Sequence, residues 1–115
     1  MKILGRLEYI QILGEGSKKW KRFQAKLDTG AQWSRIGADE AAALRLGPII
    51  DVRRIRTGSG SETRVVVPAK VKIGGYQIAV KFTVSTRRSE VIIGRRTMGK
   101  RFVISPSQKY LGGSK

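Results

Sequence analysis

The sequence predicts an all-β domain with one short helix, and three observations support this fold class. Short runs rich in β-branched residues recur along the 115-residue chain, separated by glycine-containing turns. Helix-favouring residues are concentrated in a single segment, residues 37–47. Hydrophobic residues make up 40% of the chain and charged residues 28%, which is typical of a globular protein. Because we find no linker and no repeat, we expect a single domain over residues 1–115, in which 110–115 form a loose tail.

The first half of the predicted domain consists of two strands followed by the helix. The runs Leu7–Leu13 and Lys21–Leu27 predict strands, joined by a turn of glycine and charged residues. Charged residues interrupt the apolar run at the N-terminus, so we predict a strand there rather than a signal peptide, and a cytoplasmic location. In the helix, Asp39 is expected to be the N-cap residue and Gly47 to end the helix.

Two further predicted strands, Ile49–Thr57 and Thr63–Val67, flank the segment TGSGSE at residues 57–62. Its two glycines and three small hydroxyl residues predict the mobile tip of a hairpin. Pro68 has no backbone N–H to donate, so it indicates the edge of a sheet or a bend.

The remaining predicted strands form a second hairpin and two short C-terminal elements. Lys70–Ile73 and Gln77–Ser85 alternate in polarity on either side of a Gly-Gly pair, which is a strong hairpin signal. Val91–Ile93 is fully apolar and is expected to be a buried strand. A short turn or helix from Arg95 then leads to a last strand at Arg101–Ile104.

The composition excludes several kinds of catalytic site. The chain has no cysteine and no histidine, so it can form neither a disulfide nor a Ser-His or Cys-His catalytic pair. Its eight carboxylates are scattered singly except for Asp39 and Glu40, so we predict no metal site and no cofactor. No run approaches the roughly 18 apolar residues of a transmembrane helix, so we expect no membrane association. Chemistry by carboxylates, or by lysine and serine, remains.

Two junctions, each between an apolar strand and a glycine, carry the strongest functional signal. In AKLDTGA the acid Asp28 follows the strand, and in EVIIGRR the strand ends at Gly94. Alone, Asp-Thr-Gly also fits an ordinary turn, because an aspartate side chain can accept a hydrogen bond from the backbone two residues on. Together with the glycine-rich hairpin between them, the two junctions resemble the single-lobe, retropepsin-like aspartic peptidases, which include the retroviral proteases. The resemblance covers roughly residues 23–104 and implies a closed β-barrel lobe of the acid protease fold.

The C-terminal sequence IIGRRTMGKRFVISPSQKYL is similar to a prokaryotic subfamily of these peptidases, the "ATP-dependent zinc proteases" associated with the glutamate ligase RimK. Its members carry a Gly-Arg-Arg element, a Gly-x-Phe strand and a terminal Ser-x-x-Tyr or Ser-x-x-Phe element. The corresponding residues are Gly94–Arg96, Phe102 and Ser107–Tyr110, with the glycine of the second element displaced to Gly99. The zinc in the subfamily's name finds no support in this sequence.

The resemblance implies an endopeptidase in which two carboxylates share one proton and activate a water molecule. Because the chain has one Asp-Thr-Gly, Asp28 could form such a pair only with Asp28 of a second copy, at the two-fold axis of a homodimer. By resemblance, Thr29 would connect the two acid loops, Gly30 would let the loop turn toward the carboxylates, and Ala31 would stay small beside the substrate. Ile93 would pack behind the loop.

The resemblance also predicts substrate-binding residues in a flap and beside the acid loop. The flap would close over an extended peptide or protein substrate and exclude water. Its residues are Thr57, Gly58, Ser59 and Gly60. Gln32 stands where retroviral proteases have an aspartate that pairs with the arginine of the Gly-Arg element, so Arg95 lacks that partner.

The net charge of +16 predicts an anionic partner. We expect an acidic substrate, including a glutamate-tailed peptide, to be held by Arg95, Arg96 and the arginines of residues 53–56. Charges spread over strands also fit a merely solvated surface.

The sequence also leaves two non-catalytic functions open. One is a basic β-barrel that binds RNA or the ribosome, with aromatic side chains stacked on bases. The candidate stacking residues are Trp20, Phe23, Trp33 and Tyr76. The other is a peptidase fold that serves only for dimerisation, with its acid idle.

Overall fold

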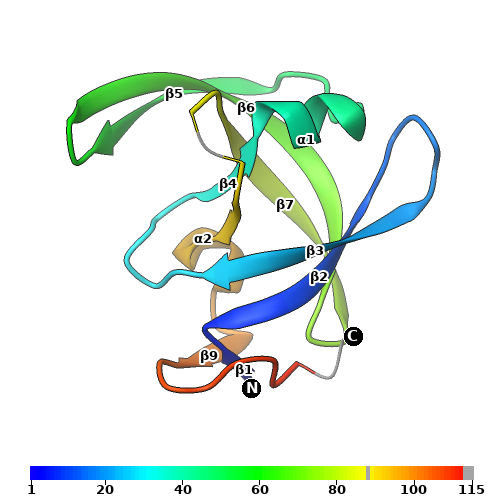
Figure 1. Cartoon of the computed structure of the whole chain (residues 1–115), viewed down its shortest axis with the longest axis vertical. Helices are drawn as coiled ribbons and strands as arrows, with labels where there is room; N and C mark the ends of the chain where they lie inside the picture. The colour runs from blue at the N-terminus through cyan, green and yellow to red at the C-terminus, as the bar shows by residue number, and fades with distance from the viewer. Residues whose placement is uncertain (88, 113–115) are drawn as a thin grey trace.

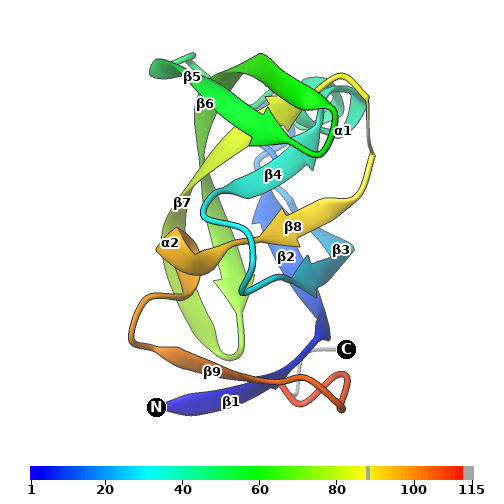
Figure 2. The ribbon, with the colours of Figure 1, turned by 90° about the vertical axis from the view of Figure 1, so that its left-hand side faces the viewer.

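The computed structural model describes residues 1–87 and 89–112, which form a β-barrel with a two-stranded sheet at one end (Figures 1 and 2). These residues contain nine strands and two short helices. The strands are β1 Lys2–Gly5, β2 Leu7–Leu13, β3 Trp20–Leu27, β4 Ser34–Gly37, β5 Asp51–Thr57, β6 Gly60–Ile73, β7 Tyr76–Ser85, β8 Val91–Ile93 and β9 Phe102–Ser105. The helices are α1 Ala38–Ala43 and α2 Arg95–Met98. The all-β prediction is confirmed, and α2 forms where a short turn or helix was expected from Arg95.

Six strands close into the barrel. They are hydrogen-bonded in the order β2, β3, β8, β4, β7, β6, and β6 pairs again with β2 through Gln11–Lys72 and Ile12–Val71. β5 pairs with β6 outside this ring and extends from the barrel as a long hairpin (Figure 1). β1 and β9 pair in parallel as a separate sheet.

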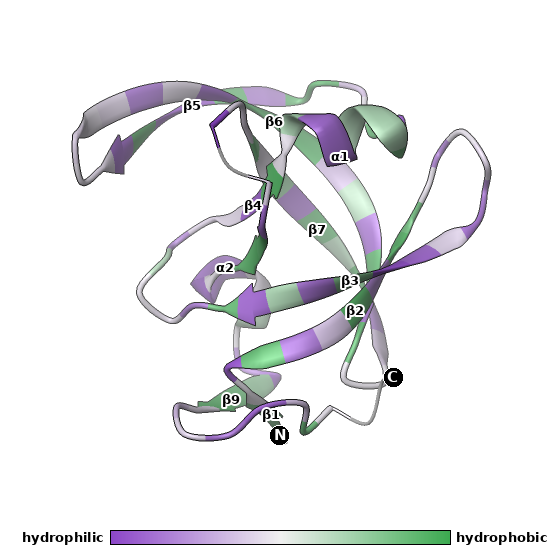
Figure 3. Ribbon diagram, in the orientation of Figure 1, coloured by the Kyte–Doolittle hydropathy of each residue, from purple (hydrophilic) through white to green (hydrophobic). Residues whose placement is uncertain are grey.

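Alternation of polarity explains why the barrel strands form and which side of each faces inward. Along β2, buried and half-buried residues alternate strictly, and Ile10 and Ile12 are completely buried. Hydrophobic and hydrophilic bands alternate in the same way along β2 and β3 in Figure 3. Burial of one isoleucine side chain contributes about 1.5–3 kcal/mol, so the inward rows stabilise the closed barrel. The completely buried core side chains include Ile10, Ile12, Ile36, Val71, Phe82 and Ile93.

The largest error in the strand prediction concerns β6. The two strands predicted at Thr63–Val67 and Lys70–Ile73 lie in one 14-residue strand that passes through Pro68. Pro68 is tolerated because β6 has an open side there. Among the described residues, pairing with β5 ends at Val66 and pairing with β2 begins at Val71. The edge position that the proline indicated is therefore correct, whereas the bend is not required.

β4 was not predicted, and the apolar run at the N-terminus forms two strands, β1 and β2, that are separated at Arg6. β4 has only four residues, yet it lies inside the barrel sheet, parallel to β7 and antiparallel to β8. A four-residue segment with one aliphatic side chain gives too little alternation to be recognised, and partners supplied by distant segments hold it in place. The other predicted strand boundaries agree with the structure to within two residues.

The predicted ends of the main helix are wrong at both sides. α1 begins after Gly37, which provides no side-chain cap, and Asp39 lies within the first turn instead of capping it. At the other end, Arg45 adopts a left-handed φ of 53°, and Leu46 N–H donates to the carbonyl of Ala41 at 3.0 Å. The helix therefore ends before Gly47, because a non-glycine residue takes the left-handed position. Within the described residues, no helix has the length and apolar character needed to cross a membrane.

The C-terminal segment is anchored up to the last described residue. The carboxylate of Glu8, which is 1% exposed, accepts backbone hydrogen bonds from Gly5 at 2.6 Å, Leu111 at 2.8 Å and Gly112 at 3.0 Å. The ring of Tyr110 stacks on Tyr9, with centroids 4.8 Å apart. The expected loose tail therefore does not begin at residue 110, and the rest of that prediction, residues 113–115, lies outside the described residues.

We predict that Glu8→Gln lowers the free energy of unfolding by about 2–3 kcal/mol. The amide turns one acceptor into a donor that faces backbone N–H groups, and buried hydrogen bonds to a charged group contribute about 1.5–3 kcal/mol. Urea unfolding followed by circular dichroism would measure the change. Glu15→Gln is the matched control, because Glu15 pairs with the exposed Lys18. Equal losses in the two variants would contradict the role assigned to Glu8.

Candidate active site

Asp28 lies directly after β3, in a loop whose backbone is fixed on both sides. β3 pairs in parallel with β8, and Leu27 is registered with Ile93. Asp28 N–H donates to the Ile93 carbonyl at 2.9 Å, and Gly30 N–H donates to the Asp28 side chain at 2.9 Å. Ala31 N–H closes the turn on the Asp28 carbonyl at 3.2 Å. The predicted positions of Gly30 beside the acid and Ile93 behind it agree with this geometry.

The beginning of α2 supports the other side of the acid loop. The first two residues of the helix donate backbone N–H groups to the carbonyls of Ala31, at 2.8 Å, and Gln32, at 3.1 Å. Gly94 lies against the same loop, and a Cβ atom there would come within 2.6 Å of the backbone of Trp33. Because backbone cannot move aside as a flexible side chain can, this position requires glycine.

Buried and exposed side chains complete the connection between α2 and the loop. Ser34 is 1% exposed, accepts a hydrogen bond from Gly94 N–H at 3.0 Å and shares a short one with the Thr97 hydroxyl. Arg95 Nη1 donates to the carbonyl of Thr29 at 3.0 Å. Arg95 therefore has a role although an acid is missing at Gln32, because it contacts loop backbone instead of a carboxylate.

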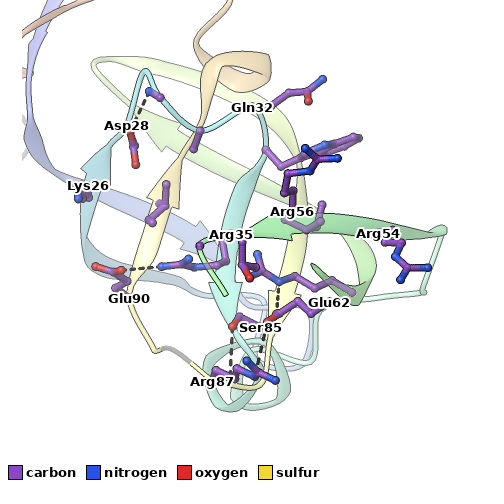
Figure 4. A pocket seen from close by; sticks show the side chains of 18 of the residues that line it. Lys26, Asp28, Gln32, Arg35, Arg54, Arg56, Glu62, Ser85, Arg87 and Glu90 are labelled. Carbon is purple, nitrogen blue, oxygen red and sulfur yellow. Dashed lines mark hydrogen bonds and ion pairs between the residues drawn. The ribbon is translucent and has the colours of Figure 1, made fainter. Parts of the chain in front are cut away.

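A cleft of about 1100 Å³ opens between the acid loop, the barrel wall and the β5–β6 hairpin (Figure 4). Ten of the fifteen residues predicted for the site line it: Asp28, Gly30, Ala31, Gln32, Arg54, Arg56, Thr57, Gly58, Ser59 and Arg95. The other five do not line it: Thr29, Arg53, Gly60, Ile93 and Arg96. Ile93 is completely buried and acts through its carbonyl, whereas Thr29 is exposed. The cleft thus brings together the acid loop and the predicted flap, which are separated by more than twenty residues.

The hairpin over the cleft has a shorter tip than predicted. Thr57 and Gly60 are paired, so Gly58 and Ser59 alone form the turn. Gly60 has a φ of 133°, a conformation that side chains other than hydrogen disfavour. The hairpin is polar: Arg54 Nε donates to the Ser61 hydroxyl at 3.0 Å.

Among the described residues, seven basic and three acidic side chains line the cleft, and most of these were not predicted as site residues. Arg35 donates to Glu90 at 2.6 Å, and Glu62 forms ion pairs with Arg64 and, at 3.7 Å, with Arg87. The Arg64 side chain holds the pKa of Glu62 below its ordinary value by hydrogen bonding, against the opposing effect of burial. Both Glu62 and Glu90 are thus engaged with arginines, which leaves Asp28 as the cleft carboxylate without an ion pair in the described part of the chain.

One row of side chains on the barrel wall connects the acid to these ion pairs. Lys26 on β3 and Arg35 on β4 are both registered with Ile92 on β8, and all three line the cleft. Lys26 could have been found from the sequence, because it precedes Asp28 by two positions and so shares its side of the strand. Arg35 could not, because its place depends on β4, which the sequence did not reveal.

Trp33 connects the hairpin to α2. The guanidinium of Arg96 on α2 lies 4.4 Å from the centroid of its ring, and the guanidinium of Arg53 on β5 lies 5.2 Å from the same centroid. Cation–π contacts of this kind contribute about 0.5–1 kcal/mol each at exposed sites. Arg96, predicted to bind substrate, therefore packs on Trp33 beside the cleft.

The chemistry available in the cleft is that of the carboxylate of Asp28, because the other two carboxylates there form ion pairs with arginines. Within the described residues, no group of three or more carboxylate, histidine or cysteine side chains could hold a metal ion. An isolated carboxylate can accept a proton or a hydrogen bond. Hydrolysis of an amide by carboxylates alone requires a second acid beside the first.

Comparison with known proteins establishes the fold. No family model and no curated protein matches the chain. Among solved structures it is similar to a Legionella pneumophila protein of unknown function (DUF785), with 16% identity, a TM-score of 0.62 and coverage of 96% of this chain and 98% of that one. It is also similar to EIAV protease in complex with the inhibitor HBY-793 (21% identity, TM-score 0.64, 78% and 81% covered). Simian foamy virus protease is a third neighbour (18% identity, TM-score 0.56, 79% and 89% covered). The chain therefore has a retropepsin-like fold.

We predict that the contribution of Glu62 to stability disappears in acid. Its pKa is lowered in the folded protein, so its stabilising effect is complete above the ordinary glutamate pKa and is lost as pH falls through the folded-state value. The difference in unfolding free energy between wild type and Glu62→Gln should be largest near neutral pH and shrink below about pH 4. Urea titrations from about pH 3 to pH 7 would measure it, and a difference independent of pH would contradict the prediction.

Proposed function

We propose that this protein is an aspartic endopeptidase that works as a homodimer, with Asp28 of each copy forming the catalytic pair. The observation that carries the proposal is the position of Asp28. It projects into a cleft on a retropepsin-like fold, in a turn fixed by Gly30 and Ile93. If Asp28 served only as the first residue of a turn, neither the hydrogen bonds from α2 to its loop nor its position in the cleft would be needed.

In the proposed reaction the two carboxylates share one proton, because like charges a few ångströms apart do not both ionise easily. The ionised carboxylate takes a proton from water, whose oxygen bonds to the scissile carbonyl carbon, while the protonated carboxyl donates to the carbonyl oxygen. The C–N bond then breaks as the leaving nitrogen takes up a proton from the pair. The two acids titrate together, so their apparent pKa values belong to the pair.

The charges in the cleft support a homodimer over a pair formed within one chain. The other two cleft carboxylates, Glu62 and Glu90, are held by arginines and lie away from the acid loop (Figure 4). A symmetric dimer would bring Asp28 against its own copy through the same surface on both subunits. Thr29 is exposed at the tip of the loop, where it could connect the two loops across the axis. The β5–β6 hairpin would then close over bound peptide.

We propose acidic peptides as the substrate class. Four basic side chains in the cleft form no ion pair with a carboxylate of the described chain: Lys26, Arg54, Arg56 and Arg95. Two of them come from the hairpin, one from the wall and one from α2, so they surround the cleft. An extended chain with glutamate or aspartate side chains would supply the missing anions through charge-assisted hydrogen bonds.

We predict that the wild-type protein cleaves members of a peptide library containing acidic and glutamate-tailed sequences, and that Asp28→Asn does not. Loss of a general base lowers kcat/KM by about 10²–10⁴-fold or more. Mass spectrometry of the products would identify the cleaved bonds. Cleavage should survive chelators, and Asp39→Asn, on the exposed side of α1, is the matched control.

Two results would contradict the catalytic proposal. One is a failure of the wild-type protein to cleave any library member. The other is a monomer at micromolar concentration in analytical ultracentrifugation, because the acid pair needs two copies. A dimer without cleavage would instead indicate a fold used for dimerisation.

We predict that the double variant Arg54→Gln/Arg56→Gln raises KM for a glutamate-rich peptide about 5–10-fold and leaves kcat nearly unchanged. Two exposed ion pairs contribute at most about 1 kcal/mol each. The increase should shrink at high salt and be absent for a neutral peptide. Lys19→Gln/Lys21→Gln removes the same charge away from the cleft and should leave KM unchanged. A loss equal for acidic and neutral peptides would contradict the proposed substrate class.

A further inference from the structure

A second hollow lies on the outer surface of the barrel, away from the acid loop. Its volume is about 390 Å³, and it is lined by Gln11, Lys72, Ile73, Gly75, Tyr76, Gln77 and Gly112. These residues come from β2, the β6–β7 hairpin and the C-terminal segment. In Figure 1 that hairpin turn lies at the lower right, whereas the acid loop lies at the left. None of the residues of the hollow lines the Asp28 cleft.

A row of polar side chains crosses four strands at this hollow. Gln11 is registered with Arg22 on one side and Lys72 on the other, and Lys72 is registered with Gln77. Side chains at registered positions project from the same side of a sheet. The order across β3, β2, β6 and β7 is therefore cation, amide, cation, amide. Adjacent strands lie about 4.8 Å apart, so the backbone positions of the two basic residues are separated by about 10 Å.

Aromatic rings, not carboxylates, hold both cations of this row. The guanidinium of Arg22 lies 4.5 Å from the ring centroid of Tyr9, and the ammonium of Lys72 lies 4.2 Å from that of Trp20. A ring face attracts a cation without neutralising its charge, and it leaves N–H groups available to an anion. The two cations are thus fixed in position and still positively charged.

Within the part of the chain that the structure describes, the acidic side chains leave this face free of accessible competing charge. Glu8 is buried and bound to backbone N–H groups, and Glu15 pairs with Lys18. The other six carboxylates lie in the cleft, on α1 or at the start of β5. They are Asp28, Asp39, Glu40, Asp51, Glu62 and Glu90.

We infer that this outer face binds single-stranded nucleic acid. Arg22 and Lys72 would contact two phosphates of one strand, and the amides of Gln11 and Gln77 can both donate to and accept from base edges. Tyr76 is 44% exposed, and Tyr110, one face of which stacks on Tyr9, is 40% exposed; an unpaired base would stack on the uncovered part of either ring. Paired bases offer no open faces for stacking, and an acidic peptide has no bases to stack. The inference is independent of the proposed peptidase activity.

The test measures binding of a fluorescently labelled oligouridine of about 12 nucleotides by anisotropy over a series of salt concentrations. We expect Arg22→Glu/Lys72→Glu to weaken binding at least about 10-fold and to reduce the slope of log K against log salt by about 1.4, since each phosphate contact on a single strand contributes about 0.7. The matched control Arg54→Glu/Arg56→Glu makes the same change of charge in the cleft and should change the affinity less than about two-fold. Asp28→Asn should bind as wild type does.

Two additional measurements separate this inference from a general attraction to polyanions. Gln77→Glu places one acid in the row at an exposed position and should also weaken binding without affecting folding. Polyglutamate of equal charge should compete at least about 10-fold less well than oligouridine, because it offers no bases to stack. Equal losses of oligouridine affinity in the two charge-reversed double variants would overturn the assignment. Competition by polyglutamate as strong as that by oligouridine would also overturn it, and so would absence of RNA binding by the wild type.

Discussion

The short contact between the acid loop and the β8–α2 segment determines the position of the candidate catalytic group. Asp28 takes its place because its N–H is bound by the Ile93 carbonyl, and Gly94 allows the next turn of chain to lie directly on the backbone of Trp33. The loop carbonyls are then occupied by the N-terminal N–H groups of α2 and by Arg95. Because these backbone groups are bound, a carboxylate at the end of a strand is held rigidly.

Part of the positive charge of the chain lies on two surfaces with different local chemistry. In the cleft, Glu62 and Glu90 neutralise part of the charge and fix the arginines of the wall, which leaves the hairpin arginines and Lys26 for an incoming anion. On the outer face, rings of Tyr9 and Trp20 take the place of those carboxylates. A net charge of +16 therefore does not describe a uniformly solvated surface.

The ends of the described chain are joined around one buried carboxylate. Within residues 1–87 and 89–112, Glu8 is satisfied by backbone N–H groups from both terminal segments instead of by a basic side chain. This arrangement brings the C-terminal segment against β2 and places Gly112 beside the outer hollow. The hydrogen bonds of Glu8 therefore add the C-terminal segment to an outer surface that β2 and β3 form only in part.

The sequence alone was sufficient wherever a structural signal is local. Short apolar and β-branched runs located seven of the nine strands, glycine-containing segments located two hairpin turns, and the junctions at Asp28 and Gly94 identified the acid loop together with the segment behind it. The lack of histidine and cysteine by itself restricted the possible chemistry to carboxylates, lysine and serine. These features depend on residue types and on neighbouring residues, so tertiary contacts alter them little.

Only the tertiary structure decided what depends on pairing between distant segments. Examples are the continuity of β6 through Pro68, the insertion of β4 between β8 and β7, and the closure of the barrel by β2 and β6. Those pairings place three arginines in the cleft, Arg35, Arg64 and Arg87. They also place Lys72 in the outer row. No alternation within one strand indicates which strand will lie beside it, because register is fixed by cross-strand hydrogen bonds and by the shared core.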